Sequence, residues 1–262
     1  MEINLTGKNA LVGGSSSGIG KAIAVALARC GANVTLLSRT AEKLANVVET
    51  LDVSRGQQHQ YLVTDFTDFE KHKSVLKAYF ESNTIDILVA NTNGPKAGDV
   101  TTKNELDYKE AFDLLFQSAV FMTNLALPYM QQQGYGRIIN VSSMTVKEPQ
   151  DNLVLSNTMR TALLSWYKSL SNAVAPCGIT VNSILTGYFE TDRLHSLIQA
   201  QADAAQISFA AAKDNRQQSV PMKRLGDPKE YGYLAAFIAS EYASYLTGTA
   251  IPLDGGIAKT LF

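Results

Sequence analysis

The segment Asn9-Ala-Leu-Val-Gly-Gly-Ser-Ser-Ser-Gly-Ile-Gly20 joins a short apolar run to the start of an amphipathic pattern. Its glycines Gly14, Gly18 and Gly20 have the spacing G-x3-G-x-G. Glycine accepts the positive φ angles of a sharp strand-to-helix turn, and its bare backbone lets a ligand approach closely. The start of a helix adds free N–H groups and a partial positive charge, which favour an anion such as pyrophosphate. A Gly/Ser run can also be a flexible linker, but this position between strand and helix favours a dinucleotide-binding turn.

The rest of the chain alternates short apolar runs with longer helical patterns. This alternation predicts an α/β fold: a single doubly wound Rossmann domain with a seven-stranded parallel sheet and helices on both faces. The expected strands are 9–13, 33–38, 60–64, 85–90, 136–142, 179–184 and 250–253. The expected helices are 19–30, 41–51, 105–132 and 153–175, with Pro128 bending the last turns of the third.

One segment, about 191–218, lies outside this alternation and is rich in Ala and Gln. It follows the sixth strand, and the carboxyl ends of parallel strands border the ligand crevice in such folds. We expect a helical insertion that acts as a lid. It would belong to one domain spanning residues 1–262.

Composition and charge exclude several classes of function. Of 262 residues, 45% are hydrophobic and 18% are charged, and the formal net charge is −1. No basic surplus points to nucleic acid or to a membrane surface, and no apolar run is long enough to span a bilayer. The N-terminus is acidic and lacks the apolar region of a signal peptide, so a cytoplasmic location is expected. The two cysteines, Cys30 and Cys177, form no metal-binding spacing, and we expect free thiols and no metal.

Six motifs, taken in order, resemble the short-chain dehydrogenase/reductase family over nearly the whole chain. The glycine turn matches T-G-x3-G-x-G except at Gly13, and residues 181–188 match N-x3-P-G except at Thr186. The other four motifs are residues 64–66, 88–95, 137–143 and 246–256. The resemblance implies a nicotinamide-dependent oxidoreductase that acts on a small molecule. It assigns cofactor binding to Gly14, Ser16, Ser17, Gly18, Ile19, Gly20, Ser38, Arg39, Asp65, Phe66, Asn91, Gly94, Gly187 and Thr191.

The choice of cofactor depends on the end of the second strand. An acidic residue there would bind the ribose of NAD and repel a phosphate. This chain has Ser38 and Arg39 instead. Arginine grips phosphate with paired hydrogen bonds, so the sequence favours NADP(H) over NAD(H). The alternative is that Arg39 is only a solvated charge at the start of a helix.

The catalytic positions of the family are altered in this chain. The family places a tyrosine 13 residues after its serine and a lysine 4 residues later; counted from Ser143, these positions hold Ser156 and Arg160. The family's asparagine, 13 residues before the proline of the long helix, is Leu115. A general acid such as that tyrosine contributes ~10²–10⁴ in rate. Ser156 is a poor acid with a short side chain, and Arg160 does not give up its proton, because its pKa normally exceeds ~12.

A different reaction remains open to these residues. Arg160 lies one helical turn after Ser156, on the same face. A cation beside a developing oxyanion stabilises it without proton transfer, which suits hydride addition to a conjugated alkene as well as to a carbonyl. The sequence also resembles an atypical branch of the family that includes a conjugate reductase and lacks the tyrosine. We therefore name Ser143, Arg160 and Ser156 as candidate catalytic residues.

Three further residues are candidates for the substrate side. His195 begins the expected lid and titrates near neutrality, so it is a candidate acid, although a lone histidine there is more often a surface or capping residue. Lys147 follows the fifth strand, where it could bind a substrate carboxylate or be solvated. Tyr188 could line the substrate pocket or pack against the lid.

Two functions from different classes remain. The first is an NADP(H)-dependent oxidoreductase with a non-standard proton donor. The second is a catalytically inactive NADP(H)-binding protein that regulates or scaffolds a partner. In either case the resemblance implies a homo-oligomer, a tetramer or a dimer.

Overall fold

The sheet of this computed structural model, which describes residues 2–261, contains seven strands that are all parallel to their neighbours. The strand order is β3-β2-β1-β4-β5-β6-β7. The order reverses between β1 and β4, so the crevice beyond their carboxyl ends is the expected ligand site. The predicted doubly wound α/β fold is confirmed. The strands are β1 (Asn9–Gly13), β2 (Asn33–Ser38), β3 (Gln60–Val63), β4 (Ile87–Ala90), β5 (Gly136–Val141), β6 (Ile179–Thr186) and β7 (Ala250–Leu253).

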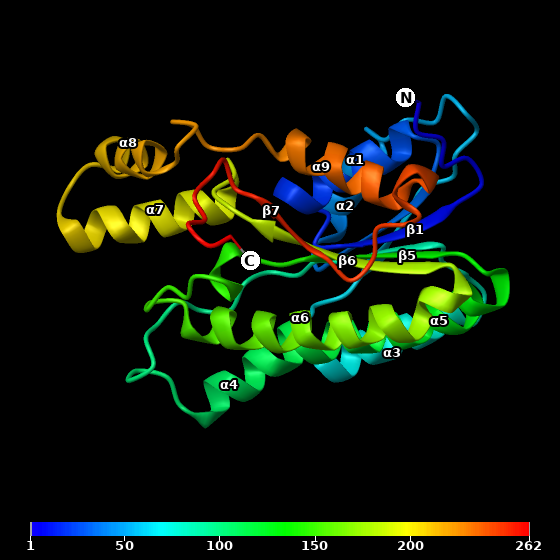
Figure 1. The fold of residues 1–262 in the computed structure, drawn as a ribbon, viewed down its shortest axis with the longest axis horizontal. Helices are drawn as coiled ribbons and strands as arrows, with labels where there is room; N and C mark the ends of the chain where they lie inside the picture. The colour runs from blue at the N-terminus through cyan, green and yellow to red at the C-terminus, as the bar shows by residue number, and fades with distance from the viewer. Residues whose placement is uncertain (1, 262) are drawn as a thin grey trace.

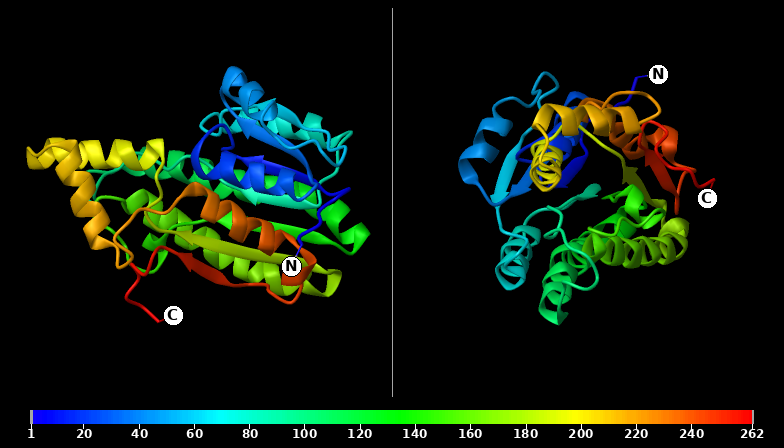
Figure 2. Two further views of the ribbon diagram at one scale, coloured as in Figure 1. Left: turned by 90° about the horizontal axis from the view of Figure 1, so that it is seen from above. Right: turned by 90° about the vertical axis from the view of Figure 1, so that its left-hand side faces the viewer.

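Helices cover both faces of this sheet, as Figure 1 and Figure 2 show. One face packs against α1 (Gly18–Arg29), α2 (Ala41–Val48) and α9 (Pro228–Ala239). The other face packs against α3 (Phe69–Phe80), α4 (Glu105–Ala111), α5 (Ser118–Gln133) and α6 (Val154–Val174). Each face therefore has its own apolar core, which explains why the strands are almost continuously hydrophobic. Short 3₁₀ helices are η2 (Met144–Val146), η3 (Ala175–Cys177) and η4 (Glu241–Ala243).

The helix predicted over 105–132 is present but not uniform. Between α4 and α5 the chain forms a π-helical segment, η1 (Phe112–Gln117). The Ser118 hydroxyl donates to the Asp113 carbonyl (2.8 Å), which satisfies an acceptor beside the widened turn. Pro128 lies inside α5.

Two helices occur where the sequence analysis named none. The Asp68 carboxylate accepts the Lys71 N–H (3.1 Å) and so caps the start of α3. Asp227 and Glu230 form a capping box in front of α9, which begins with Pro228. Both are typical helix-start signals, so the information was present in the sequence. The predicted helix 41–51 ends at Val48, and the predicted strand 85–90 begins at Ile87.

The helices α7 (Asp192–Ala205) and α8 (Phe209–Ser219) project beyond the carboxyl edge of the sheet (Figures 1 and 2). They occupy the residues predicted as an insertion, about 191–218. Their apolar faces share a small separate core, made of Leu194, Ile198, Ala202, Ala212 and Leu225. A separate core is compatible with movement relative to the sheet, and the role of this segment as a lid stays a prediction.

Candidate functional site

The glycine turn connects β1 to α1 at the switch point. Gly14 and Gly18 have φ angles of 56° and 54°, in the region that favours glycine. A side chain at Gly20 would collide with the Gly14 carbonyl. Asn91, which follows β4, donates from Nδ2 to the Gly13 carbonyl (2.9 Å). The start of α1 is thereby held against the end of β4, where a helix N-terminus can receive a pyrophosphate.

The departure from the family pattern at Gly13 has a steric cause. A Cβ atom at this position would collide with the backbone carbonyl of Asn91. The loop after β4 therefore occupies the space that a threonine side chain would need.

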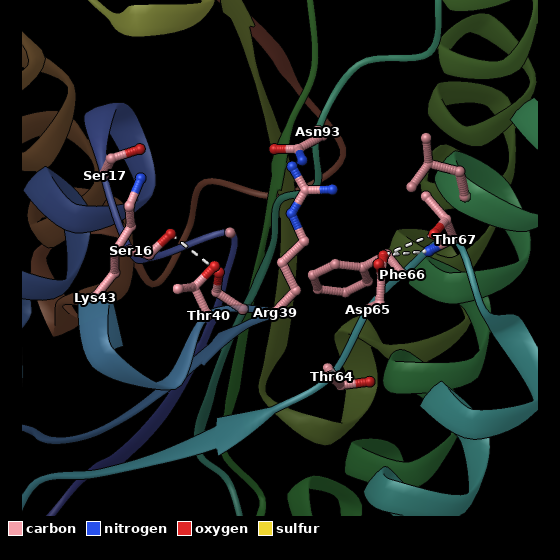
Figure 3. A pocket seen from close by; sticks show the side chains of 13 residues that line it. Ser16, Ser17, Arg39, Thr40, Lys43, Thr64, Asp65, Phe66, Thr67 and Asn93 are labelled. Atoms are coloured by element: carbon pink, nitrogen blue, oxygen red, sulfur yellow. Dashed lines mark hydrogen bonds between the residues drawn. The ribbon is translucent and has the colours of Figure 1, made fainter. Parts of the chain in front are cut away.

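A pocket lies beside the glycine turn, at the carboxyl ends of β2 and β3 (Figure 3). The Ser38 hydroxyl donates to the Ser16 hydroxyl (3.0 Å), which ties β2 to the turn. In Figure 3 the Arg39 side chain extends toward Asn93, with the Phe66 ring beside it. The lining residues are Gly14, Ser16, Ser17, Ser38, Arg39, Thr40, Lys43, Thr64, Asp65, Phe66, Thr67, Asn93 and Leu114.

The pocket combines two cations with one carboxylate. Among residues 2–261, no ion pair within 4.0 Å involves Arg39 or Lys43. Asp65 accepts both the N–H (3.0 Å) and the hydroxyl (2.8 Å) of Thr67. Partial burial alone would raise the pKa of Asp65, but these hydrogen bonds and the Arg39 charge lower it. The pocket therefore presents an ionised acid on the β3 side and available cations on the β2 side.

Lys43 and Asn93 are pocket residues that the sequence analysis did not name. Lys43 lies in the first turn of α2, four residues after Arg39, so a second cation close to Arg39 in the sequence was a usable signal. Asn93 lies in the motif 88–95, of which only Asn91 and Gly94 were predicted to bind the cofactor. Only the structure brings Asn93 across to the β2 side of the pocket.

The start of α7 covers the glycine turn. A Cβ at Gly18 would lie 3.2 Å from Cγ2 of Thr191. Thr191 caps α7 by accepting the Leu194 N–H (3.2 Å). Gly94 lies under the Arg193 guanidinium, because a Cβ there would be 3.3 Å from Nη2. Gly187 instead packs against the backbone of Asp254, so its requirement for glycine comes from the turn after β7.

The candidate catalytic residues Ser143, Ser156 and Arg160 meet at the end of β5. The Arg160 guanidinium donates from Nη1 to the Val141 carbonyl (2.6 Å) and from Nε to the Ser156 hydroxyl (3.2 Å). Ser143 follows Val141 by two residues and caps η2 by accepting the Thr145 N–H (3.2 Å). The structure thus brings a half-buried cation and two hydroxyls to one edge of the sheet.

Arg160 remains a cation in this environment. Burial lowers its pKa to about 10, with a smaller opposing effect from Tyr231 and a further lowering by the Arg193 charge. A group with this pKa is protonated at neutral pH. Arg160 can therefore stabilise negative charge, but it does not deliver a proton.

Leu115 stands at the position of the family's asparagine and lies in η1. Its side chain is buried in the core beneath the sheet. It supplies no polar atom to the crevice, which agrees with the interpretation made from the sequence.

His195 lies in a polar cluster of the projecting segment. Its Nε2 atom is 2.6 Å from Oε1 of Glu190, and the same oxygen accepts from Nζ of Lys213 (2.6 Å). The imidazole ring also contacts Phe209 edge-on, with centroids 5.8 Å apart. These contacts join α7 to α8, and the role of His195 as an acid stays a prediction.

The two predicted substrate-pocket residues follow neighbouring strands, Lys147 after β5 and Tyr188 after β6. Lys147 ends η2 and is half-buried. The Tyr188 hydroxyl accepts from Nε2 of Gln150 (3.2 Å), and the Arg216 guanidinium lies 4.5 Å above its ring. Tyr188 therefore connects the loop after β5 to α8.

Comparisons with known proteins agree with this geometry. Residues 14–258 match the family described as enoyl-(acyl carrier protein) reductase. The chain belongs to the short-chain dehydrogenase/reductase family. It is 32% identical to the NADPH-dependent reductase BacG of Bacillus subtilis, over 97% of this chain and 99% of that protein.

Two solved structures of this family are similar throughout. The crystal structure of YwfH, an NADPH-dependent reductase involved in bacilysin biosynthesis, has a TM-score of 0.89 at 32% identity and covers 97% of this chain and 99% of its own. L-Sorbose reductase from Gluconobacter frateurii, complexed with NADPH and L-sorbose, has a TM-score of 0.92 at 28% identity and covers 100% of both chains. Both are described as reductases, as the family assignment requires.

Residues 2–261 contain neither a helix suited to a membrane nor a cluster suited to a metal ion. None of the described helices combines the length and apolar character needed to cross a bilayer. No group of three or more His, Cys, Asp or Glu side chains in this part of the chain could hold a metal ion.

Proposed function

We propose that this protein is an NADP(H)-dependent oxidoreductase that transfers a hydride to a conjugated alkene or a carbonyl of a small metabolite. The observation that carries the proposal is the pocket beside the glycine turn, with Arg39 and Lys43 free of ion pairs. Two cations and the Ser38 hydroxyl fit the 2′-phosphate that distinguishes NADP from NAD. The names of the relatives BacG and YwfH support the same cofactor.

Different residues of the site would hold different parts of the cofactor. Gly14, Gly18 and Gly20 would receive the pyrophosphate, and Asp65 with Phe66 would border the adenine. Thr191, above Gly18, would close over the pyrophosphate and nicotinamide end. When bound, NADPH supplies the hydride.

The residues at the end of β5 favour addition to a conjugated alkene. The Arg160 cation would stabilise the negative charge that the hydride pushes onto the substrate carbonyl, and Ser143 would donate a hydrogen bond to the same oxygen. Neither step needs a strong acid in the protein. The proton that completes the reduction then comes from solvent or from a lid residue such as His195.

A second candidate is an inactive NADP(H)-binding protein. It is favoured by one specific observation, the replacement of the family's asparagine, tyrosine and lysine by Leu115, Ser156 and Arg160. Against it stands the half-buried Arg160 guanidinium at the end of β5, because burying a charge costs free energy and an unused site has no need of one.

The test is NADPH oxidation, followed at 340 nm, with a panel of conjugated enones, conjugated keto acids and simple ketones. The reductase proposal expects turnover of at least one conjugated substrate, and loss of most of it in Arg160→Ala with NADPH affinity retained. NADPH binding without turnover on any substrate would favour the inactive alternative. We further propose that the enzyme is a cytoplasmic homo-oligomer.

A further inference from the structure

Arg193 lies in the first turn of α7 and contacts the loop after β4. A Cβ at Gly94 would lie 3.3 Å from its Nη2 atom, and the same atom donates to the Pro95 carbonyl (3.0 Å). Among residues 2–261, no other hydrogen bond involves this guanidinium, and no carboxylate lies within 4.0 Å of it. Most of its five N–H donors are therefore available to a ligand.

Two contacts place the loop after β4 and the start of α7 against the glycine turn. On one side, Nδ2 of Asn91 donates to the Gly13 carbonyl (2.9 Å). On the other side, a Cβ at Gly18 would lie 3.2 Å from Cγ2 of Thr191, so α7 begins beside the first residue of α1. Arg193 joins the two sides, because it reaches from α7 back to the loop after β4. These contacts form a closed ring that includes the start of α1.

The start of α1 is where the cofactor pyrophosphate would lie, and Arg193 brings a full positive charge to the same ring. Free N–H groups at the start of a helix carry only partial charges. A guanidinium adds two parallel hydrogen bonds to phosphate oxygens. Arg193 does not line the pocket that contains Arg39 and Lys43. The two groups of cations would therefore serve different phosphates of the cofactor.

We propose that Arg193 is a further cofactor-binding residue, which holds the pyrophosphate of NADP(H) against the start of α1. The inference rests on the proposed function and deepens it, because the family resemblance assigns no role to this residue. NADP(H) and NAD(H) both contain the pyrophosphate, so Arg193 would strengthen the binding of both without selecting between them. Because Arg193 belongs to α7, the bound cofactor would also hold the projecting segment in this position.

The test uses two fragments of the cofactor, each of which carries one of the two phosphate groups. ADP-ribose has the pyrophosphate without the 2′-phosphate, and adenosine 2′-monophosphate has the 2′-phosphate without the pyrophosphate. Each is titrated into the full-length protein in a calorimeter. Arg193→Gln should weaken ADP-ribose by about tenfold to a hundredfold, because a charge-assisted contact is lost, and should change adenosine 2′-monophosphate by less than twofold. Arg193→Lys should lose less, because it keeps the charge.

The matched control is Arg29→Gln, which removes an exposed positive charge at the far end of α1. It should change the affinity for either fragment by less than twofold. No binding of ADP-ribose to the wild-type protein, or an unchanged affinity for it in Arg193→Gln, would overturn the proposal. Equal losses for both fragments, with faster amide exchange in α7 of the cofactor-free variant, would also overturn it and assign Arg193 to holding the segment in place. No turnover is involved, so a failure to oxidise NADPH would overturn the proposed reaction and leave this result standing.

Discussion

At the scale of single residues, the site is defined by where positive charge lies without a partner. Arg39 could be predicted to face the cofactor, because it directly follows a buried strand at the crevice. Asn93 could not, because its place in the pocket depends on how the loop after β4 approaches the end of β2, which no local pattern encodes. Gly13 was visible as a departure from the family pattern, but its cause, the Asn91 carbonyl, is a contact between two strands far apart in sequence.

Arg160 gives a prediction on pH dependence. Its pKa is lowered to about 10, so it carries its charge at neutral pH and loses it as the pH rises through that value. We expect kcat with a conjugated substrate to fall above about pH 10. In Arg160→Lys the fall should move to lower pH, because lysine has an ordinary pKa of ~10.4 and the same burial would lower it further.

The measurement is a pH–rate profile of both proteins, with circular dichroism to show that each stays folded. A fall between pH 6 and 8 that is identical in both proteins would contradict the assignment. It would point instead to a group other than residue 160.

At the scale of elements, the strands and most helices were predicted because each has a clear apolar period. The helices α3 and α9 were not predicted, although capping residues mark their starts, and in α3 apolar residues alternate with charged ones without a long hydrophobic run. The π-helical η1 was not predicted, and it interrupts a pattern that reads as one continuous helix. It packs against α6, a contact that no local sequence pattern encodes.

The corner between β3 and α3 contains a buried histidine and yields a stability prediction. His72 is buried beside the Phe66 ring and contacts the Thr64 hydroxyl (3.2 Å), and burial lowers its pKa to about 4. In the unfolded chain this histidine has a pKa of ~6.5, so between the two pKa values the unfolded state binds more protons than the folded state. The stabilisation linked to His72 is therefore complete above about pH 6.5 and is lost as the pH falls toward 4. The free energy of unfolding falls by up to about 3 kcal/mol over this range.

Urea unfolding at pH 7 and pH 4.5 tests this expectation. The wild-type protein should lose more free energy of unfolding between these pH values than His72→Leu, which has no proton to bind at this position. Carboxylate titration affects both proteins and cancels in the comparison. Equal losses would mean that His72 is not responsible.

At the scale of the whole molecule, the doubly wound topology and the place of the crevice could be predicted from the order of strands and helices. The homo-oligomer remains a prediction, and it would use a surface on the helices that cover the α4 and α6 face of the sheet. Phe112 and Phe116 of η1 stack on each other with centroids 5.1 Å apart, and Trp166 of α6 contacts Phe116 edge-on at 6.5 Å. All three side chains are half-exposed, so they form an apolar patch that a second copy could cover.

We expect a dimer or tetramer in sedimentation velocity at micromolar concentration. Trp166→Glu should shift the protein toward the monomer, because it places a charge in the covered patch. Tyr245→Glu, at an exposed residue after η4, is the matched control. A wild-type protein that sediments as a monomer would refute the predicted assembly.

The central claim is that the pocket beside the glycine turn selects NADP(H). The most direct test is a nicotinamide-fluorescence titration of the wild-type protein and the double variant Arg39→Ala/Lys43→Ala with NADPH and with NADH. The account predicts that the wild-type protein binds NADPH at least tenfold more tightly than NADH, and that the double variant loses about tenfold or more of its NADPH affinity with little change for NADH. Equal affinity of the wild-type protein for both cofactors, or binding of neither, would contradict it.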